Sequence, residues 1–175
     1  SIVVLPDMRG IIAEFDAIAS TIRQAGGKAH VYAIDVTDLD RFAGFVAAAR
    51  PFDAFVNNAG TNRPKPFTEV TTDDFDVIMG LNVRAAFFAA QAVVKRMIET
   101  KTHGSIVNVS SQMGHVGGAL RTVYCASKFA MEGFTKAFAA EVSSRNIMAN
   151  CVSPGFIESA MTEKLNDKQK ETLFV

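Results

Sequence analysis

The sequence Gly-Ser-Ile-Val-Asn-Val-Ser-Ser at residues 104–111 decides the fold class. Its short apolar centre is typical of a buried strand. A helical pattern follows over residues 123–143, and a second strand-like run covers residues 148–152. Strands that alternate with helices in this way indicate a parallel sheet. The predicted class is therefore α/β.

The same alternation extends along the rest of the chain. Further strands are predicted at residues 2–5, 29–34 and 54–56, and further helices at residues 10–24, 41–49 and 72–96, the last of them broken around Gly80. Helices are expected on both faces of the sheet. No repeat or interdomain linker interrupts the pattern, so residues 1–175 are predicted to form a single domain.

Composition excludes several classes of function. The 175 residues are 49% hydrophobic with a formal net charge of zero, which fits a soluble globular domain. A balanced charge without Lys/Arg runs argues against nucleic acid and membrane surfaces as partners. No apolar stretch of membrane-spanning length and no signal peptide is recognised, so a cytoplasmic location is expected. Histidines and cysteines lack metal-ligand spacing, so no metal site is predicted.

Tyr124 and Lys128 lie four residues apart, and a helix would place their side chains on one face. A tyrosine by itself titrates near pH ~10, but a neighbouring cation lowers its pKa towards neutrality. Such a tyrosine can act as a general acid or base. Ser111 precedes it by thirteen residues, and Asn57-Asn58-Ala59-Gly60 and Leu81-Asn82-Val83 lie further upstream.

Together these motifs resemble the classical branch of the short-chain dehydrogenase/reductase family. The family has an Asn-Asn-Ala-Gly turn after its fourth strand, an asparagine in the next helix, a serine ending the fifth strand, a Tyr-x-x-x-Lys pair, and Pro-Gly after the sixth strand. In this chain the motifs are Asn57 to Gly60, Asn82, Ser111, Tyr124 with Lys128, and Pro154-Gly155. The resemblance extends from about Val3 to Thr162. It implies a Rossmann-like, doubly wound parallel sheet.

One motif of the family is missing. Its first strand and its glycine-rich turn, which cradles the cofactor pyrophosphate, have no counterpart here, and residues 2–5 correspond to the second strand. In the strand order 3-2-1-4-5-6 the missing strand lies between the second and fourth, so its loss leaves two unpaired edges. The domain is therefore expected to be an incomplete part of a longer polypeptide.

The resemblance implies an NAD(P)-dependent oxidoreductase that interconverts a secondary alcohol and a ketone by hydride transfer. Negative charge then develops on the carbonyl oxygen, which requires a hydrogen-bond donor and a proton source. Tyr124 is the predicted acid or base, and Ser111 the donor, with Ser110 as its competitor. Lys128 is expected to bind the nicotinamide ribose and to lower the pKa of the tyrosine. Asn82 is expected to hold a water that links Lys128 to solvent.

Cofactor contacts are expected on loops at the carboxyl ends of the strands. By resemblance they are Asp7, Asp35, Val36, Asn57, Ala59, Gly60, Tyr124, Lys128, Pro154, Gly155, Ile157 and Ser159. Asp7, at the end of its strand, can accept both adenosine ribose hydroxyls and therefore favours NAD. The nearby Arg9 favours NADP, so both cofactors stay open.

Three further questions concern substrate, class and assembly. The segment 112–123 is compatible with a 3-oxoacyl thioester and with a sugar or polyol as the small-molecule substrate. The missing glycine turn favours an alternative, a non-catalytic dinucleotide-binding relative with a regulatory or structural role. The helical spans 85–94 and 129–140 are apolar on almost all sides and must be buried on more than one side. A homotetramer or homodimer is therefore expected.

Overall fold

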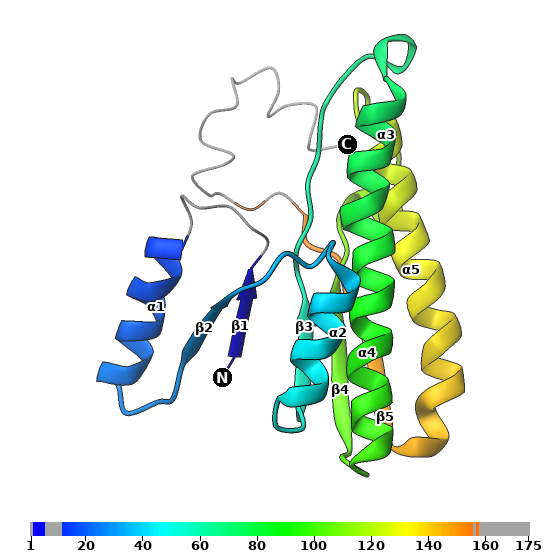
Figure 1. Cartoon of the computed structure of the whole chain (residues 1–175). Coiled ribbons are helices and arrows are strands. Elements are labelled where there is room, and N and C mark those ends of the chain that lie inside the picture. The colour runs from blue at the N-terminus through cyan, green and yellow to red at the C-terminus, as the bar shows by residue number, and fades with distance from the viewer. Residues whose placement is uncertain (1, 6–11, 156, 158–175) are drawn as a thin grey trace.

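The computed structural model describes residues 2–5, 12–155 and 157, and strands and helices alternate along them (Figure 1). The strands are β1 (Ile2–Leu5), β2 (His30–Ala33), β3 (Ala54–Asn57), β4 (Gly104–Val109) and β5 (Ile147–Val152). The helices are α1 (Ile12–Gln24), α2 (Leu39–Ala48), α3 (Thr72–Met79), α4 (Ala86–Glu99) and α5 (Thr122–Val142). These bounds lie within three residues of the predicted ones, and the α/β prediction is confirmed.

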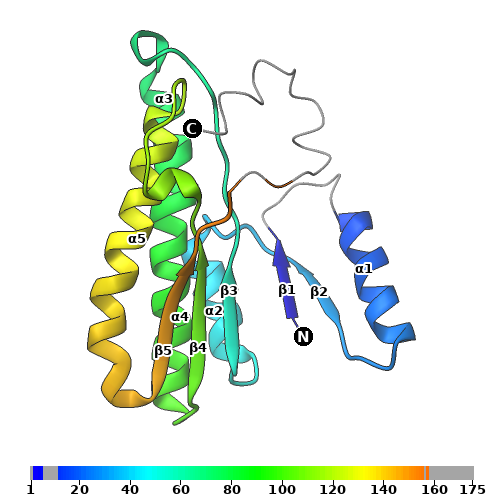
Figure 2. The same ribbon diagram turned by 180° about the vertical axis from the view of Figure 1, so that it is seen from behind.

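All strand pairs are parallel, but the described strands form two separate sheets. β1 pairs with β2, with Ile2 opposite His30, and the second sheet has the order β3-β4-β5, with Ala54 opposite Ser105. β1 lies on the side of β3 away from β4 without pairing to it (Figure 2). The division falls where the sequence lacks a counterpart of the family's first strand.

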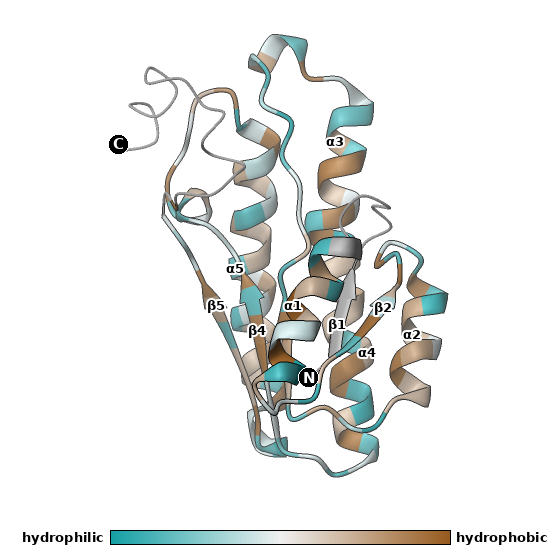
Figure 3. Cartoon of the chain, turned by 90° about the vertical axis from the view of Figure 1, so that its left-hand side faces the viewer, coloured by the Kyte–Doolittle hydropathy of each residue, from teal (hydrophilic) through white to brown (hydrophobic). Residues whose placement is uncertain are grey.

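The two sheets differ in how helices cover them. Helices α2, α4 and α5 lie behind β3, β4 and β5 in Figure 2, on one face only. Ile106 and Asn108 point towards these helices and are fully buried, whereas Val56 and Met148 are 58% and 63% exposed. In Figure 3, β2, the strand that pairs with β1, lies between α1 and α2. Helices on both faces, as predicted, are therefore present only around β1 and β2 within the described residues.

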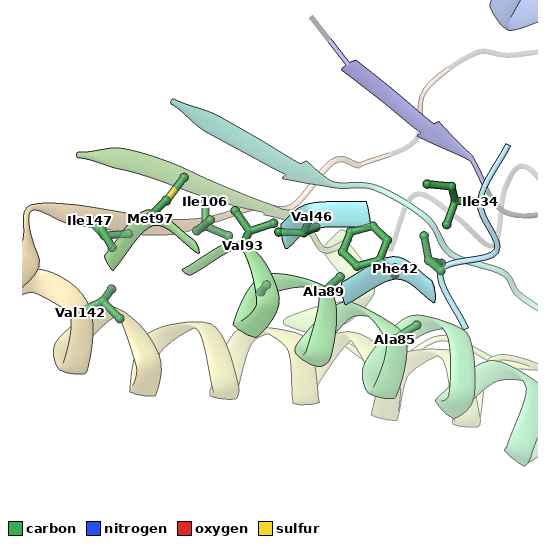
Figure 4. Close-up of a cluster of buried hydrophobic side chains, with 12 residues drawn as sticks. Ile34, Phe42, Val46, Ala85, Ala89, Val93, Met97, Ile106, Val142 and Ile147 are labelled. Carbon is green, nitrogen blue, oxygen red and sulfur yellow. The ribbon is translucent and has the colours of Figure 1, made fainter. Parts of the chain in front are cut away.

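The main hydrophobic core lies between the three-stranded sheet and its helical layer (Figure 4). Val93 and Met97 of α4 and Ile106 of β4 are completely buried. Each side chain of this kind contributes roughly 1.5–3 kcal/mol by leaving water. The core therefore fastens α4 and α5 onto the strands whose carboxyl ends carry the polar motifs.

The helix predicted to break at Gly80 continues without interruption into α4. Thr71 and Asp74 form a capping box at its start, and residues Gly80–Ala85 are wound as a π-helix between α3 and α4. By length and composition the run Thr72–Glu99 is apolar enough to cross a membrane. The prediction that the sequence contains no apolar stretch of that length was therefore wrong. α4 contributes Ala89, Val93 and Met97 to the core, so one side of this helix packs inside the protein.

Candidate functional site

The polar motifs gather at the carboxyl ends of β3, β4 and β5. Asn57 ends β3, while Ser110 and Ser111 follow β4. Beyond the strands, Ser110 N donates to Val152 O and Gln112 N donates to Pro154 O, both at 2.8 Å. The two loops therefore stay in register after the sheet ends. In this architecture ligands bind at that edge of the sheet.

Lys128 is the buried cation of the site. It lies on α5 and is only 5% exposed, and its Nζ donates to Val109 O at 2.8 Å. Burial lowers the pKa of its ammonium to about 8, because the charged form loses hydration. Of its three donors, one has an acceptor among the described residues, so two remain for a ligand.

Tyr124 lies one turn before Lys128 on the same helix. The Lys128 Nζ is 5.6 Å from the centroid of its ring, within cation–π range. The ring is half-buried, and its hydroxyl makes no hydrogen bond to any described residue. The predicted placement of both side chains on one helix face is therefore confirmed, with a phenol available to a ligand.

Asn82 lies in the π-helix and is fully buried. Its Oδ1 accepts from Thr61 N at 2.7 Å, and its Nδ2 donates to Thr61 O at 2.9 Å and to Ser127 Oγ at 3.0 Å. Ser127 in turn donates to Tyr124 O at 2.7 Å. Asn82 thus connects the loop after β3 with the first turns of α5. π-Helical turns occur frequently at functional sites.

The two candidate serines differ in their surroundings. Ser110 is buried, and its Oγ donates to Lys128 O at 3.4 Å, so it packs against α5. Ser111 is half-buried and caps the short 3-10 helix Gln112–Gly114, where its Oγ accepts from Met113 N at 3.2 Å. The hydroxyl of Ser111 can still donate its hydrogen to a ligand.

The Asn-Asn-Ala-Gly turn approaches the same site. Asn57 is buried and donates from Nδ2 to Ala86 O at 2.7 Å, so it holds the end of β3 to α4, while Ala59 packs on the core. A Cβ added to Gly60 would lie 3.3 Å from Asn82 Oδ1 and 3.8 Å from Lys128 Nζ. The backbone of Gly60 therefore forms a wall of the site.

The remaining predicted contacts are more dispersed. Asp35 follows β2 and its Oδ1 accepts from Thr37 N and Oγ1, at 2.8 and 2.7 Å, while the neighbouring Val36 is buried in the core. Pro154 and Gly155 follow β5 at the same edge, and Ile157 is 62% exposed. Asp7 and Ser159, and Arg9 with them, lie outside the described residues.

Two sets of site residues were not predicted from the sequence. Thr61 and Ser127 hold Asn82 on both sides. A second set consists of His115, Glu132 and Ser153, which meet around the Glu132 carboxylate. The sequence did contain one sign of the role of Glu132. It is a charged residue on a largely apolar helix span, and a charge that is buried there needs partners.

Comparison with known proteins gives consistent matches. The family model described as short chain dehydrogenase matches residues 8–170. Nodulation protein G of Rhizobium meliloti (strain 1021) is 46% identical over 70% of this chain and 50% of its own length. The 3-oxoacyl-[acyl-carrier-protein] reductase of Thermotoga maritima is 39% identical over 90% of this chain and 65% of its own length.

A solved structure matches as well. The structure of a putative 2-deoxy-d-gluconate 3-dehydrogenase from Agrobacterium tumefaciens, with bound NADP, superposes with a TM-score of 0.83 at 33% identity. The match covers 90% of this chain and 65% of the other. The chain therefore spans between half and two thirds of the length of these proteins.

Proposed function

The chain belongs to the short-chain dehydrogenase family. We propose that it forms part of an oxidoreductase that interconverts a secondary alcohol and a ketone with NAD or NADP. The observation that carries the proposal is the meeting of Tyr124, Lys128 and Asn82 at one edge of the sheet, beside Ser111. Three helix and loop segments that are distant in sequence converge there. A tyrosine and a lysine that shared only an exposed helix surface would not need these contacts from other segments.

The site suits a nicotinamide dinucleotide. Lys128 is closed off from bulk water and keeps two donors, which match two adjacent hydroxyls of a ribose. Gly60 has no side chain, so a ligand can approach its backbone closely on the adjacent side of the site. When bound, the dinucleotide supplies or accepts the hydride. Asp7 favours NAD over NADP in this proposal, through repulsion of a 2′-phosphate.

The chain's own residues handle the proton and the charge. In the reductive direction Tyr124 donates its phenolic proton to the carbonyl oxygen, and Ser111 donates a hydrogen bond to the same oxygen. The Lys128 ammonium stabilises the resulting phenolate. Asn82 holds the loop at Thr61 against α5 and supports a water through which Lys128 exchanges protons with solvent. In the oxidative direction each step is reversed.

Two substrate classes are supported by different comparisons. A 3-oxoacyl thioester is the first candidate, because the Thermotoga maritima reductase matches 90% of the chain at 39% identity. A sugar acid is the second, because the Agrobacterium tumefaciens structure superposes over the same share of the chain at 33% identity. Both classes present a secondary alcohol or its ketone to Tyr124, so the same proton chemistry serves either.

The test is an assay of the purified full-length protein with NADH and with NADPH. Turnover of an acetoacetyl thioester, or of a keto sugar acid, is followed through the absorbance of the reduced nicotinamide, and dinucleotide affinity is measured in parallel by titration. Turnover of either substrate class supports the proposal. Tight dinucleotide binding without turnover of either class favours the non-catalytic relative. Failure to bind either dinucleotide contradicts both.

A further inference from the structure

Glu132 is a buried carboxylate for which the proposed proton chemistry has no use. It lies one turn after Lys128 on α5 and is 6% exposed. Its Oε1 accepts from Ser153 Oγ at 2.7 Å and lies 3.3 Å from His115 Nε2, while His115 Nε2 and Ser153 Oγ are 3.0 Å apart. We call these three residues the Glu132 clasp.

Each member of the clasp comes from a different segment of the site. His115 ends the 3-10 helix that begins directly after Ser111, and Ser153 directly precedes Pro154. The 3-10 helix also packs closely on α5, since a Cβ on Gly114 would lie 3.1 Å from Lys128 O and 3.3 Å from Glu132 Cγ. One carboxylate therefore fastens the loop of Ser111 and the segment of Pro154 to the helix of Lys128.

Several neighbouring groups stabilise the negative charge of Glu132. Burial raises the pKa of its carboxyl, but the hydrogen bond from Ser153, together with the nearby Ser110 hydroxyl and His115, outweighs burial, so the pKa lies below its ordinary value. Cys151 of β5 also faces this carboxylate. A buried carboxylate with several donors holds its partners firmly, because leaving any one unpaired is costly.

We propose that Glu132 is a positioning residue that sets the Ser111 loop and the Pro154–Gly155 segment relative to Tyr124 and Lys128. The His115 arm orients the loop of Ser111 and so acts on turnover. The Ser153 arm orients the Pro154–Gly155 segment and so acts on dinucleotide binding. The inference rests on the proposed function, which assigns those two segments to substrate and cofactor.

The two arms predict different kinetic defects in the full-length protein. His115→Ala should lower kcat by about three- to tenfold, as expected for one lost hydrogen bond, with the dinucleotide Kd within about twofold. Ser153→Ala also removes the 3.0 Å contact to His115 Nε2, but His115 keeps its 3.3 Å contact with the Glu132 carboxylate. The variant should therefore raise the dinucleotide Kd by a similar factor and leave kcat at saturating cofactor within about twofold. Glu132→Gln should combine both defects, because it removes the charge that the two arms share.

Matched controls separate positioning from general destabilisation. Glu141→Gln removes an exposed carboxylate from the same helix, and His103→Ala removes an exposed histidine; both should behave as wild type. Tm is measured for every variant. Parallel losses of kcat and dinucleotide affinity in all three clasp variants, following Tm, would overturn the inference, as would values within twofold of wild type.

The same experiment keeps the two proposals apart. Tyr124→Phe serves as the reference for lost chemistry. If Tyr124→Phe is inactive and the clasp variants are unaffected, the positioning role is wrong and the proposed function stands. If Tyr124→Phe is active, the proposed function fails, and the dinucleotide Kd of Ser153→Ala, measured without substrate, still decides for or against the clasp.

Discussion

The Lys128 ammonium lies 5.6 Å from the centroid of the Tyr124 ring and donates to Val109 O from a site that is closed to bulk water. The helix places the two groups together, and the end of β4 orients the ammonium. Burial makes this charge less stable than a surface charge. A neighbouring group or a ligand can therefore shift the protonation of the Lys128 ammonium.

The stability of the protein should rise between about pH 8 and pH 10.5, through Lys128. The pKa of the folded-state ammonium is about 8, below its ordinary value of 10.5, so the unfolded state binds more protons in this window. Each unit of pKa difference corresponds to about 1.4 kcal/mol, which limits the component to about 3 kcal/mol. Urea unfolding of wild type and Lys128→Met at both ends of the window measures it.

The control for this experiment is Lys136→Met, which removes an exposed ammonium from the same helix. Its unfolding free energy should change with pH as that of wild type does. Only Lys128→Met should lose the rise. Identical pH dependence in wild type and Lys128→Met would show that the ammonium is not held in its charged form at a cost.

Asp74 should contribute stability that is lost in acid. It accepts from Lys65 Nζ at 2.6 Å and from Thr71 Oγ1 and N at 2.7 and 3.1 Å, and these bonds hold the pKa of its carboxyl well below the ordinary value. Asp74→Asn should lower the unfolding free energy near neutral pH, because it removes the negative charge that these hydrogen bonds stabilise in the capping box. Because a depressed carboxyl pKa stabilises only above the ordinary pKa, this difference should shrink below about pH 4.

Asp73→Asn is the matched control for Asp74. Asp73 belongs to the same helix start but is 77% exposed, and it pairs with Arg63 at 2.7 Å. An exposed pair of this kind contributes little. Equal losses of unfolding free energy in the two variants would contradict the assigned role of Asp74 in the capping box.

The aromatic side chains on α4 and α5 should form a contact between subunits. Phe87 and Phe88 are 41% and 40% exposed, and Phe87 packs edge-on against Phe134 at 5.4 Å between ring centroids. Phe88→Glu should lower the oligomer mass seen in sedimentation, because a charge would be buried at the contact. Phe67→Glu, at a position 76% exposed on a 3-10 helix, should leave it unchanged. A monomeric wild type at micromolar concentration would refute the assembly.

Local patterns predicted the elements and the shared helix face of Tyr124 and Lys128 well. Alternating strand and helix periods located α5 and β4 within a residue or two, and the four-residue spacing placed Tyr124 and Lys128 on one face. These features depend on short-range geometry, which sequence spacing records directly.

Long-range pairing was not accessible in the same way. The partners of Asn82 are Thr61, 21 residues away, and Ser127, 45 residues away, and the clasp joins residues 115, 132 and 153. Such contacts arise from packing between elements and leave only a weak trace, a polar residue on an apolar face. The π-winding at Gly80–Ala85 was likewise read from the sequence only as a break.

The measurement that tests the central claim most directly is the turnover of Tyr124→Phe on a confirmed substrate, with the dinucleotide Kd measured alongside. In the proposed mechanism the phenol acts on the substrate oxygen and contributes little to cofactor binding, so kcat should fall by about 10²–10⁴-fold or more, while the Kd stays within a few-fold of wild type. If Tyr124→Phe keeps more than about a tenth of wild-type turnover, a loss smaller than a general acid–base group supplies, then Tyr124 is not the proton donor and the catalytic assignment fails.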